Sequence, residues 1–196
     1  MGTGRLEAFS DGVIAIIVTI MVLELRAPSQ PTLPALLRVA PSLLSYLLSF
    51  LVVAIMWVNH HHMMHSVREV TARLLWLNVN LLFWMSLIPF VTDYMGKNYR
   101  QPLPVAMYGV VLTLSAAAFY LLRTELVWQY QDDTEMSSYH GSMQRKNLFS
   151  VMLYLMSAPL AYVSVYFSYL IFVGIAASYF LPEKKLASGE QGSAIS

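Results

Sequence analysis

The chain has 196 residues, of which 57% are hydrophobic and 12% charged, and its formal net charge is +1. Soluble domains carry about 25% charged residues, so this composition indicates a single integral membrane domain instead. The Lys and Arg residues are scattered, which excludes the broad basic surface of a nucleic-acid-binding protein, and the absence of cysteine excludes disulfides and cysteine zinc sites.

The first helix is predicted from the uncharged run 12–23, which we extend to 8–25 because one crossing needs about 20 helical residues. Four residues on it recur at intervals of four, three and four and form one stripe with a fifth at its edge: Gly12, Ile16, Thr19 and Leu23, with Ile20. The stripe could line a pore or pack against other helices, since every face of this helix is apolar.

Three further helices are predicted over the uncharged runs 39–67, 74–92 and 101–122. Each run is long enough for one crossing, and the first of them ends in a cluster of histidines that extends into water. The charged segment 123–146 follows the fourth predicted helix. We expect it to form a solvated cytoplasmic hairpin or extended helix ends.

The last uncharged run spans 36 residues, too many for one crossing and about right for two short ones. Pro159, Ser164 and Ser168 provide places for the chain to turn. We therefore expect helices over 146–161 and 164–181. The chain is predicted to be an all-α integral membrane protein with six transmembrane helices.

Six crossings place both termini on the same side of the membrane. Eight basic residues then lie on that side and four on the other: Arg5, Arg68, Arg73, Arg123, Arg145, Lys146, Lys184 and Lys185 against Arg26, Arg38, Lys97 and Arg100. The excess predicts cytoplasmic termini. The chain is accordingly divided into one six-helix membrane domain, 1–182, and a disordered cytoplasmic tail, 183–196.

The N-terminal end of the first helix carries Arg5 and Asp11 at or near membrane depth. Ionisable groups at this depth cost several kcal/mol unless they are paired. Ser10 or Asp11 could cap the helix, the group could join two helices through polar contacts, or it could bind ions directly. The residue types alone favour the cap or the interhelical contact.

Four histidines end the second predicted helix: His60, His61, His62 and His65. His61 and His65 are four residues apart and share a helix face, which is a spacing found in zinc-binding helices. No nearby carboxylate obviously completes a metal site. We therefore expect the histidines to face water or to bond to neighbouring helices, with Asn78 and Asn80 as candidate partners.

No motif of an enzyme or of a known ion filter is present. The chain lacks a Walker loop, a Gly-x-Ser-x-Gly elbow, a dinucleotide fingerprint, the Thr-Val-Gly-Tyr-Gly filter and an arginine ladder. We therefore expect no catalytic residue.

The start of the chain nevertheless resembles a specific family signature. Arg5, Phe9, Ser10, Asp11 and Ile16 fit the pattern R-x-x-x-F-S-D-x-x-x-x-I. This pattern is similar to that of the transmembrane protein 175 family, the lysosomal potassium channels and their bacterial relatives.

Two further elements agree with the resemblance. Trp57-x-x-His60 looks like the second-helix element of the family, and Asn78 with Pro89 looks like its third helix. The resemblance covers the first three helices, whereas the later ones match only as hydrophobic segments. One repeat of six helices is the bacterial form of the family, which assembles as a homotetramer.

The resemblance implies a potassium-selective, leak-like cation channel in the bacterial plasma membrane, without a carbonyl filter and without a cofactor. Four copies of the first helix would surround the pore, with Ile16 as its hydrophobic constriction. The implied lining positions are Gly12, Thr19, Ile20 and Leu23, with Glu24 at the outer mouth. A polar network would hold this helix, formed by Arg5, Phe9, Ser10, Asp11, Trp57, His60 and Asn78.

Selectivity has to arise without a cage of carbonyl oxygens. An isoleucine ring restricts the diameter and excludes water, so an ion loses part of its hydration shell there. Potassium releases water more readily than sodium, and a layer of Thr19 hydroxyls would add to this preference. Ala15 occupies a position where some relatives carry serine, so we expect a weaker polar lining and only modest selectivity.

Two other functions fit parts of the sequence. A small proton- or cation-coupled secondary transporter could use Asp11 and the histidines as a relay. Metal sensing through His61, His62 and His65 is a further reading, and it requires zinc binding at physiological concentrations.

Overall fold

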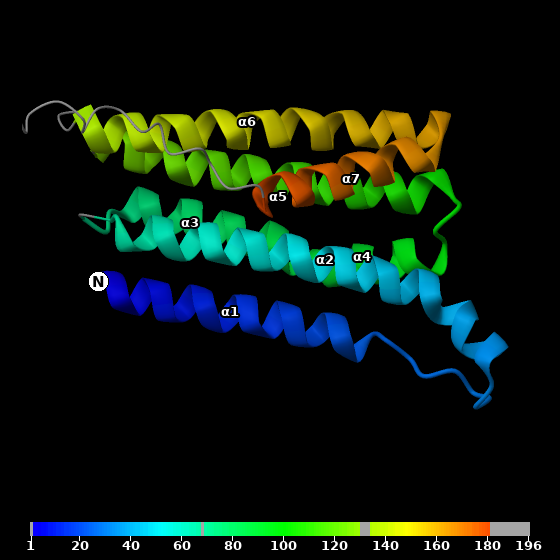
Figure 1. The fold of residues 1–196 in the computed structure, drawn as a ribbon. Helices are drawn as coiled ribbons and strands as arrows, with labels where there is room; N and C mark the ends of the chain where they lie inside the picture. Colours follow the sequence, from blue (N-terminus) through cyan, green and yellow to red (C-terminus); the bar gives the residue numbers. More distant parts are fainter. Residues whose placement is uncertain (1, 68, 130–133, 181–196) are drawn as a thin grey trace, which may run out of the picture.

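The computed structural model describes residues 2–67, 69–129 and 134–180, and all of its regular structure is α-helical (Figure 1). The helices are α1 (Thr3–Leu23), α2 (Leu33–His65), α3 (Ala72–Ser86), α4 (Ile88–Lys97), α5 (Pro102–Gln129), α6 (Thr134–Val163) and α7 (Val165–Phe180). The prediction of an all-α protein is confirmed. The predicted tail, 183–196, lies outside the described residues.

Among the described residues, four helical segments are long and apolar enough to cross a membrane: α1, α2, the pair α3 and α4 taken together over Ala72–Lys97, and α5. A shorter apolar segment, Val165–Tyr179, lies in α7. The structure thus supports a membrane domain with several crossings. The number of six crossings, and with it the side of each terminus, stays a prediction.

The third predicted helix, 74–92, is two helices that meet at Leu87, so the expectation of one continuous helix was wrong. Pro89 has no amide hydrogen, and the carbonyl of Met85 therefore loses its usual helical donor. The Leu87 amide bonds instead to the Trp84 carbonyl, three residues back, at 3.2 Å. The chain then continues in nearly the same direction as α4.

The split of the last uncharged run is confirmed, because α6 and α7 meet at Ser164. The Ser168 hydroxyl donates to the Ser157 carbonyl at 2.7 Å and holds the returning helix against α6. Pro159, one of the three predicted places for a turn, lies inside α6 and within the predicted helix 146–161.

Several helices extend beyond the uncharged runs that predicted them. The second helix begins at Leu33, where Thr32 accepts a hydrogen bond from the Ala35 amide, and α5 continues to Gln129. The predicted start of the fifth helix, at residue 146, was wrong because α6 begins at Thr134. Charged residues are good helix formers outside the bilayer, so the end of an uncharged run does not mark the end of a helix. The alternative of extended helix ends in 123–146 is confirmed.

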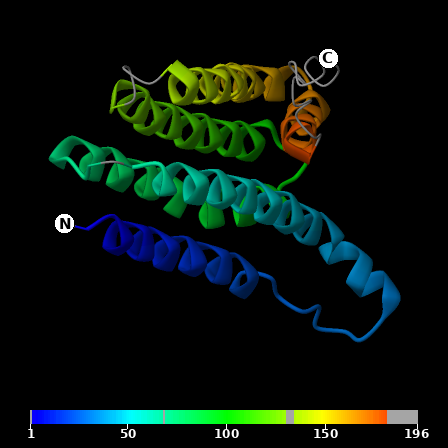
Figure 2. The ribbon, with the colours of Figure 1, turned by 60° about the vertical axis from the view of Figure 1, so that its left-hand side comes forward.

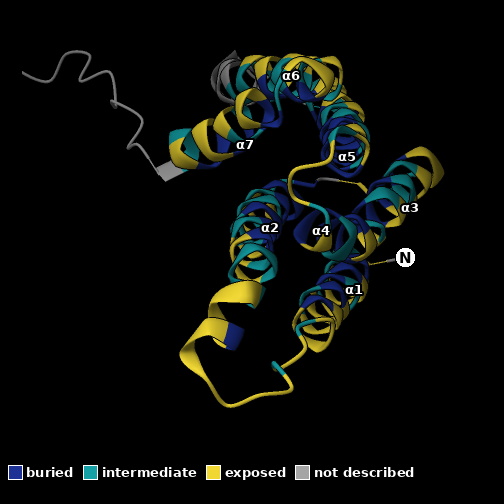
Figure 3. Cartoon of the chain, turned by 90° about the vertical axis from the view of Figure 1, so that its right-hand side faces the viewer, coloured by how far each residue is buried: buried dark blue, intermediate teal, exposed yellow. Residues whose placement is uncertain are grey.

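The helices are arranged in successive layers, with α1 at one side, then α2 with α3 and α4, then α5 and α6 (Figures 1 and 2). Neighbours α1 and α2 run in opposite directions, so the start of α1 lies at the same end as the histidines of α2. Helix α5 is central, with 67% of its most apolar window buried, whereas only 28% of that of α1 is buried. Helix α1 lies at the edge of the chain (Figure 1), and one of its sides is exposed (Figure 3).

Candidate functional site

Helix α1 has two distinct faces. One face is buried against the neighbouring helices and consists of Leu6, Ser10, Ile14, Ile17 and Met21. The other face is exposed and consists of Phe9, Gly12, Ile16, Thr19, Ile20 and Leu23. The whole predicted pore stripe thus lies on the exposed face, with Ile16 59% and Leu23 78% exposed.

The exposure of the stripe shows that it does not pack against another helix within the described part of the chain. Packing within one chain uses the opposite face, so the stripe of Ile16 and Leu23 has no partner helix in the described part of the chain. Gly12 has no atom within 4 Å of the place where a side chain would begin. The exposed face of α1 is therefore free to meet lipid, water or other copies of the chain.

Thr19 adds a polar atom to this face. It is exposed, and its hydroxyl donates a hydrogen bond to the Ile16 carbonyl of its own helix at 2.9 Å. Because the hydrogen is used inside the helix, the hydroxyl oxygen faces outward as an acceptor. An acceptor oxygen one turn from an exposed isoleucine can coordinate a cation.

A buried chain of three polar side chains holds the other face of α1. The Asn78 Nδ2 amide donates to the Ser10 Oγ at 2.9 Å, and Ser10 donates in turn to the Leu6 carbonyl at 2.9 Å. The Asn78 Oδ1 lies 2.8 Å from His60 Nε2, which must be the donor because an amide oxygen only accepts. All three side chains are 0% exposed.

These three hydrogen-bonded side chains link three helices, because Ser10 lies on α1, His60 on α2 and Asn78 on α3. In a bilayer, apolar helices gain no hydrophobic free energy from each other, so such bonds fix which faces meet. Of the two asparagines expected to bond to histidines, Asn78 does so. Asn80 has no side-chain hydrogen bond in the described residues.

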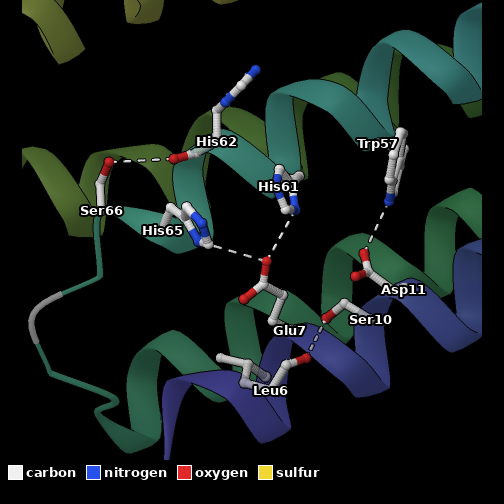
Figure 4. A network of polar contacts seen from close by, with 9 residues as sticks. All are labelled: Leu6, Glu7, Ser10, Asp11, Trp57, His61, His62, His65 and Ser66. Atoms are coloured by element: carbon white, nitrogen blue, oxygen red, sulfur yellow. Dashed lines mark hydrogen bonds and ion pairs between the residues drawn. The ribbon is translucent and has the colours of Figure 1, made fainter.

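A second contact joins Asp11 to the second helix. The Trp57 indole Nε1 donates to Asp11 Oδ1 at 2.9 Å (Figure 4). Five residues of the predicted polar network are thus brought together, although as two separate contacts. Arg5 and Phe9 are exposed, and within the described ranges the Arg5 side chain forms neither an ion pair nor a hydrogen bond. The structure does not bring these two into the network.

Sequence reasoning missed Glu7, which is the partner of the exposed histidines. Its Oε1 lies 3.0 Å from His61 Nδ1 and 3.7 Å from His65 Nδ1, and Figure 4 shows both rings turned toward it. The signal was present, since Glu7 precedes Asp11 by four residues and shares its helix face. His62 points away from this group.

The predicted outer-mouth residue lies at the far end of α1. Glu24 is the C-terminal cap residue of the helix and is exposed. Its position next to Leu23 continues the exposed face of α1 with a negative charge.

A family model described as endosomal/lysosomal potassium channel TMEM175 matches residues 5–89, which contain the polar contacts of α1 with α2 and α3. Over 187 residues the chain is 36% identical to a protein of Chryseobacterium strain P1-3 that is named a potassium channel, and the match covers 95% of this chain and 96% of that protein.

A solved structure and a human protein are also similar. The crystal structure of a lysosomal potassium-selective channel TMEM175 homolog from Chamaesiphon minutus matches with a TM-score of 0.71 and 28% identity, over 90% of this chain and 95% of that one. The chain is 27% identical over 177 residues to the human endosomal/lysosomal proton channel TMEM175, of which the match covers 35%, and of this chain 82%.

Proposed function

The chain belongs to the TMEM175 family of ion channels, and we propose that it forms a potassium-selective, leak-like cation channel in which four copies of α1 surround the pore. Bacterial relatives similar over nearly their full length are named potassium channels, which supports potassium as the permeant ion. The family is one of channels and not of enzymes.

One observation carries the proposal. The face of α1 with Gly12, Ile16, Thr19 and Leu23 is uncovered, while the opposite face is held by Ser10. Four helices that turn such a face toward one axis would bury large apolar side chains that a single chain leaves exposed. A homotetramer therefore gives this face a partner and forms a pore at the same time.

The proposed pore has a hydrophobic constriction at Ile16 and a ring of oxygens at Thr19. Four isoleucine side chains would narrow the path and exclude water, so that a passing ion sheds part of its hydration shell. The Thr19 oxygens, one turn further along, would replace some of that water. Potassium gives up its water more easily than sodium, which favours its passage.

The ends of the pore follow from the direction of the helix. Glu24 would lie at the outer mouth and raise the local concentration of cations. Arg5 and the histidines of α2 would lie at the cytoplasmic side of a bacterial plasma membrane. This orientation rests on the excess of basic residues on the side of the termini.

The ion preference is tested by the reversal potential of the purified protein in planar bilayers, with potassium on one side and sodium on the other. We expect a current that reverses close to the potassium equilibrium potential. A current without preference would refute potassium selectivity, and the absence of any current together with slow, saturable flux into liposomes would refute the channel.

The constriction is tested by Ile16→Asn. The amide wets the narrowest ring, so we expect a larger current and a reversal potential shifted toward zero. Leu170→Asn is the matched control, because Leu170 is 70% exposed and lies on α7, a different helix from the proposed pore helix. It should leave conduction and selectivity unchanged. Unchanged currents in Ile16→Asn would remove Ile16 from the constriction.

A proton-coupled transporter is the second candidate. Glu7, His61 and His65 form a titratable group beside α1, and the human relative is named a proton channel. The same bilayer experiment with a pH gradient in place of the sodium gradient separates the two. A carrier would give flux that saturates with substrate and no unitary openings.

A further inference from the structure

Four side chains that bind metals meet between α1 and α2 (Figure 4). The ligand atoms of Glu7, Asp11 and His61 all lie within 4.8 Å of one another. His65 approaches from the next turn of α2, with its ring centre 4.9 Å from that of His61. From this arrangement we infer that Glu7, Asp11, His61 and His65 form a binding site for a zinc-like divalent metal ion.

The distances suit such an ion. Bonds of about 2.0 to 2.1 Å in a tetrahedron place two ligand atoms about 3.3 Å apart. The Glu7 carboxylate lies 3.0 Å from the nearest nitrogen of His61 and 3.7 Å from that of His65, one value on each side of this separation. The separations of Glu7 from the two histidines are therefore close to those that a tetrahedral ion needs.

Asp11 completes the set of four. Trp57 bonds to its Oδ1, and no hydrogen bond to its Oδ2 occurs among the described residues. The free oxygen can turn toward the ion while the indole holds the other. Two imidazoles and two carboxylates, from two positions on each helix, give a zinc-like ligand set, whereas magnesium and calcium prefer oxygen alone.

One atom of the group lacks a hydrogen bond. His61 Nδ1 is buried and forms none, although the Glu7 carboxylate lies 3.0 Å away. A buried nitrogen without a partner is costly. A metal ion between the nitrogen and the carboxylate would satisfy both.

The negative charge of the group also favours a bound metal ion. Two carboxylates within 4.8 Å repel each other, and Glu7 is mostly shielded from water with a side chain that is 18% exposed. Arg5 on the same helix is exposed and forms no ion pair in the described part of the chain. A divalent cation would offset the two negative charges.

The site also has an entrance. The His65 side chain is 70% exposed and that of His61 is 37% exposed, so the group opens to solvent on the side of α2. A bound ion would connect α1 to α2 beside the Ser10 contact. This inference does not rest on the proposed function, because binding can be measured whether or not the protein conducts potassium.

The test is titration calorimetry of the full-length protein in detergent with zinc chloride, after removal of any histidine tag and in the presence of magnesium. We expect one zinc per chain with a Kd of about 10 μM or tighter. Glu7→Gln and His61→Ala should each weaken binding by about tenfold or more, because each removes a ligand.

His62→Ala is the matched control, since it removes an exposed imidazole of the same cluster that points away from Glu7. It should bind zinc as the natural protein does. If His61→Ala does not assemble, as judged by gel filtration, the exposed His65→Ala takes its place and should also weaken binding. A Kd weaker than about 100 μM in the natural protein, or equal losses in His62→Ala and the ligand variants, would overturn the site.

Discussion

Replacement of Asn78 by alanine is the sharpest test of how α1 is held. Asn78 is fully buried and forms two side-chain hydrogen bonds, one to Ser10 on α1 and one to His60 on α2. Alanine removes both bonds at once. No other residue contacts both of these partners through its side chain among the described ranges, so we expect Asn78→Ala to be more damaging than the loss of either partner bond alone.

The size of the effect follows from the bonds and from what remains after they are lost. Side-chain hydrogen bonds inside membrane proteins contribute about 0.6 kcal/mol on average and up to about 1.7 kcal/mol. His60 Nδ1 already has no hydrogen bond, so without Asn78 both ring nitrogens of a buried histidine would be unpaired. An unpaired buried group costs about 1 to 3 kcal/mol. We therefore expect Asn78→Ala to lower the free energy of unfolding by about 2 to 4 kcal/mol.

The partner variant should cost less. Ser10→Ala removes one bond and leaves the one between Asn78 and His60 in place, so its expected cost is about 1 kcal/mol. The double variant should cost about as much as Asn78→Ala alone, because the two residues share the bond that is lost. Additive losses would show that the bond between them contributes nothing.

The free energy of unfolding can be measured by titration with sodium dodecyl sulfate in mixed micelles, at one fixed protein concentration. Asn80→Ala is the control, because Asn80 lies on the same helix, is half-buried, and has no side-chain hydrogen bond among the described residues. Its expected cost is below about 0.5 kcal/mol. Equal losses in Asn78→Ala and Asn80→Ala would refute the argument that the buried bonds hold α1.

Two further substitutions test neighbouring contacts by the same titration. Asp11→Ala should lower the free energy of unfolding by about 1 kcal/mol and should also reduce the fraction of tetramer in gel filtration. Asp11→Asn keeps the acceptor for Trp57 and should recover most of this loss, whereas equal losses in the two variants would assign the effect to the charge. Gly96→Ala should cost about 1 to 3 kcal/mol because its Cβ would lie 2.9 Å from the Ser42 Cα, and Gly174→Ala, with no atom within 4 Å, should cost nothing.

The sequence could predict helices but not their full lengths. Uncharged runs locate the part of a helix that lies in hydrocarbon. The last run was too long for one crossing, which is why a break between residues 161 and 164 was predicted close to the observed one at Ser164. They contain no information about helix that continues into water, so the start of α6 at Thr134 was missed by twelve residues relative to the predicted 146. The break at Leu87 was missed for a different reason, since a proline near the middle of a long apolar run can either kink a helix or be tolerated within it.

The sequence could predict most residues of the candidate site, but not which of them bond to each other. A fixed motif located Ser10 and Asp11, and the polar character of Asn78 made it a candidate partner for a histidine. Which histidine it bonds to depends on the rotation of α2, which no periodicity in a uniformly apolar helix reveals. Glu7 was missed because its partner lies on another helix, more than fifty positions away in the chain.

The spacing of the polar residues and Ile16 along α1 places them on opposite faces of the helix. Ser10 and Asp11 follow Glu7 by three and four residues, so all three lie on one side of the helix. Each contacts a different residue of α2 or α3. Ile16 follows Glu7 by nine residues, which is about two and a half turns, and therefore lies on the opposite side. Apolar contacts further along α1 do not fix its rotation strongly, because in lipid one apolar face is as favourable as another. A rotation by one residue, about 100°, would break all three polar contacts together and would turn Ile16 away from the uncovered face. The polar residues at the start of the helix thus determine which side chain faces outward two and a half turns later.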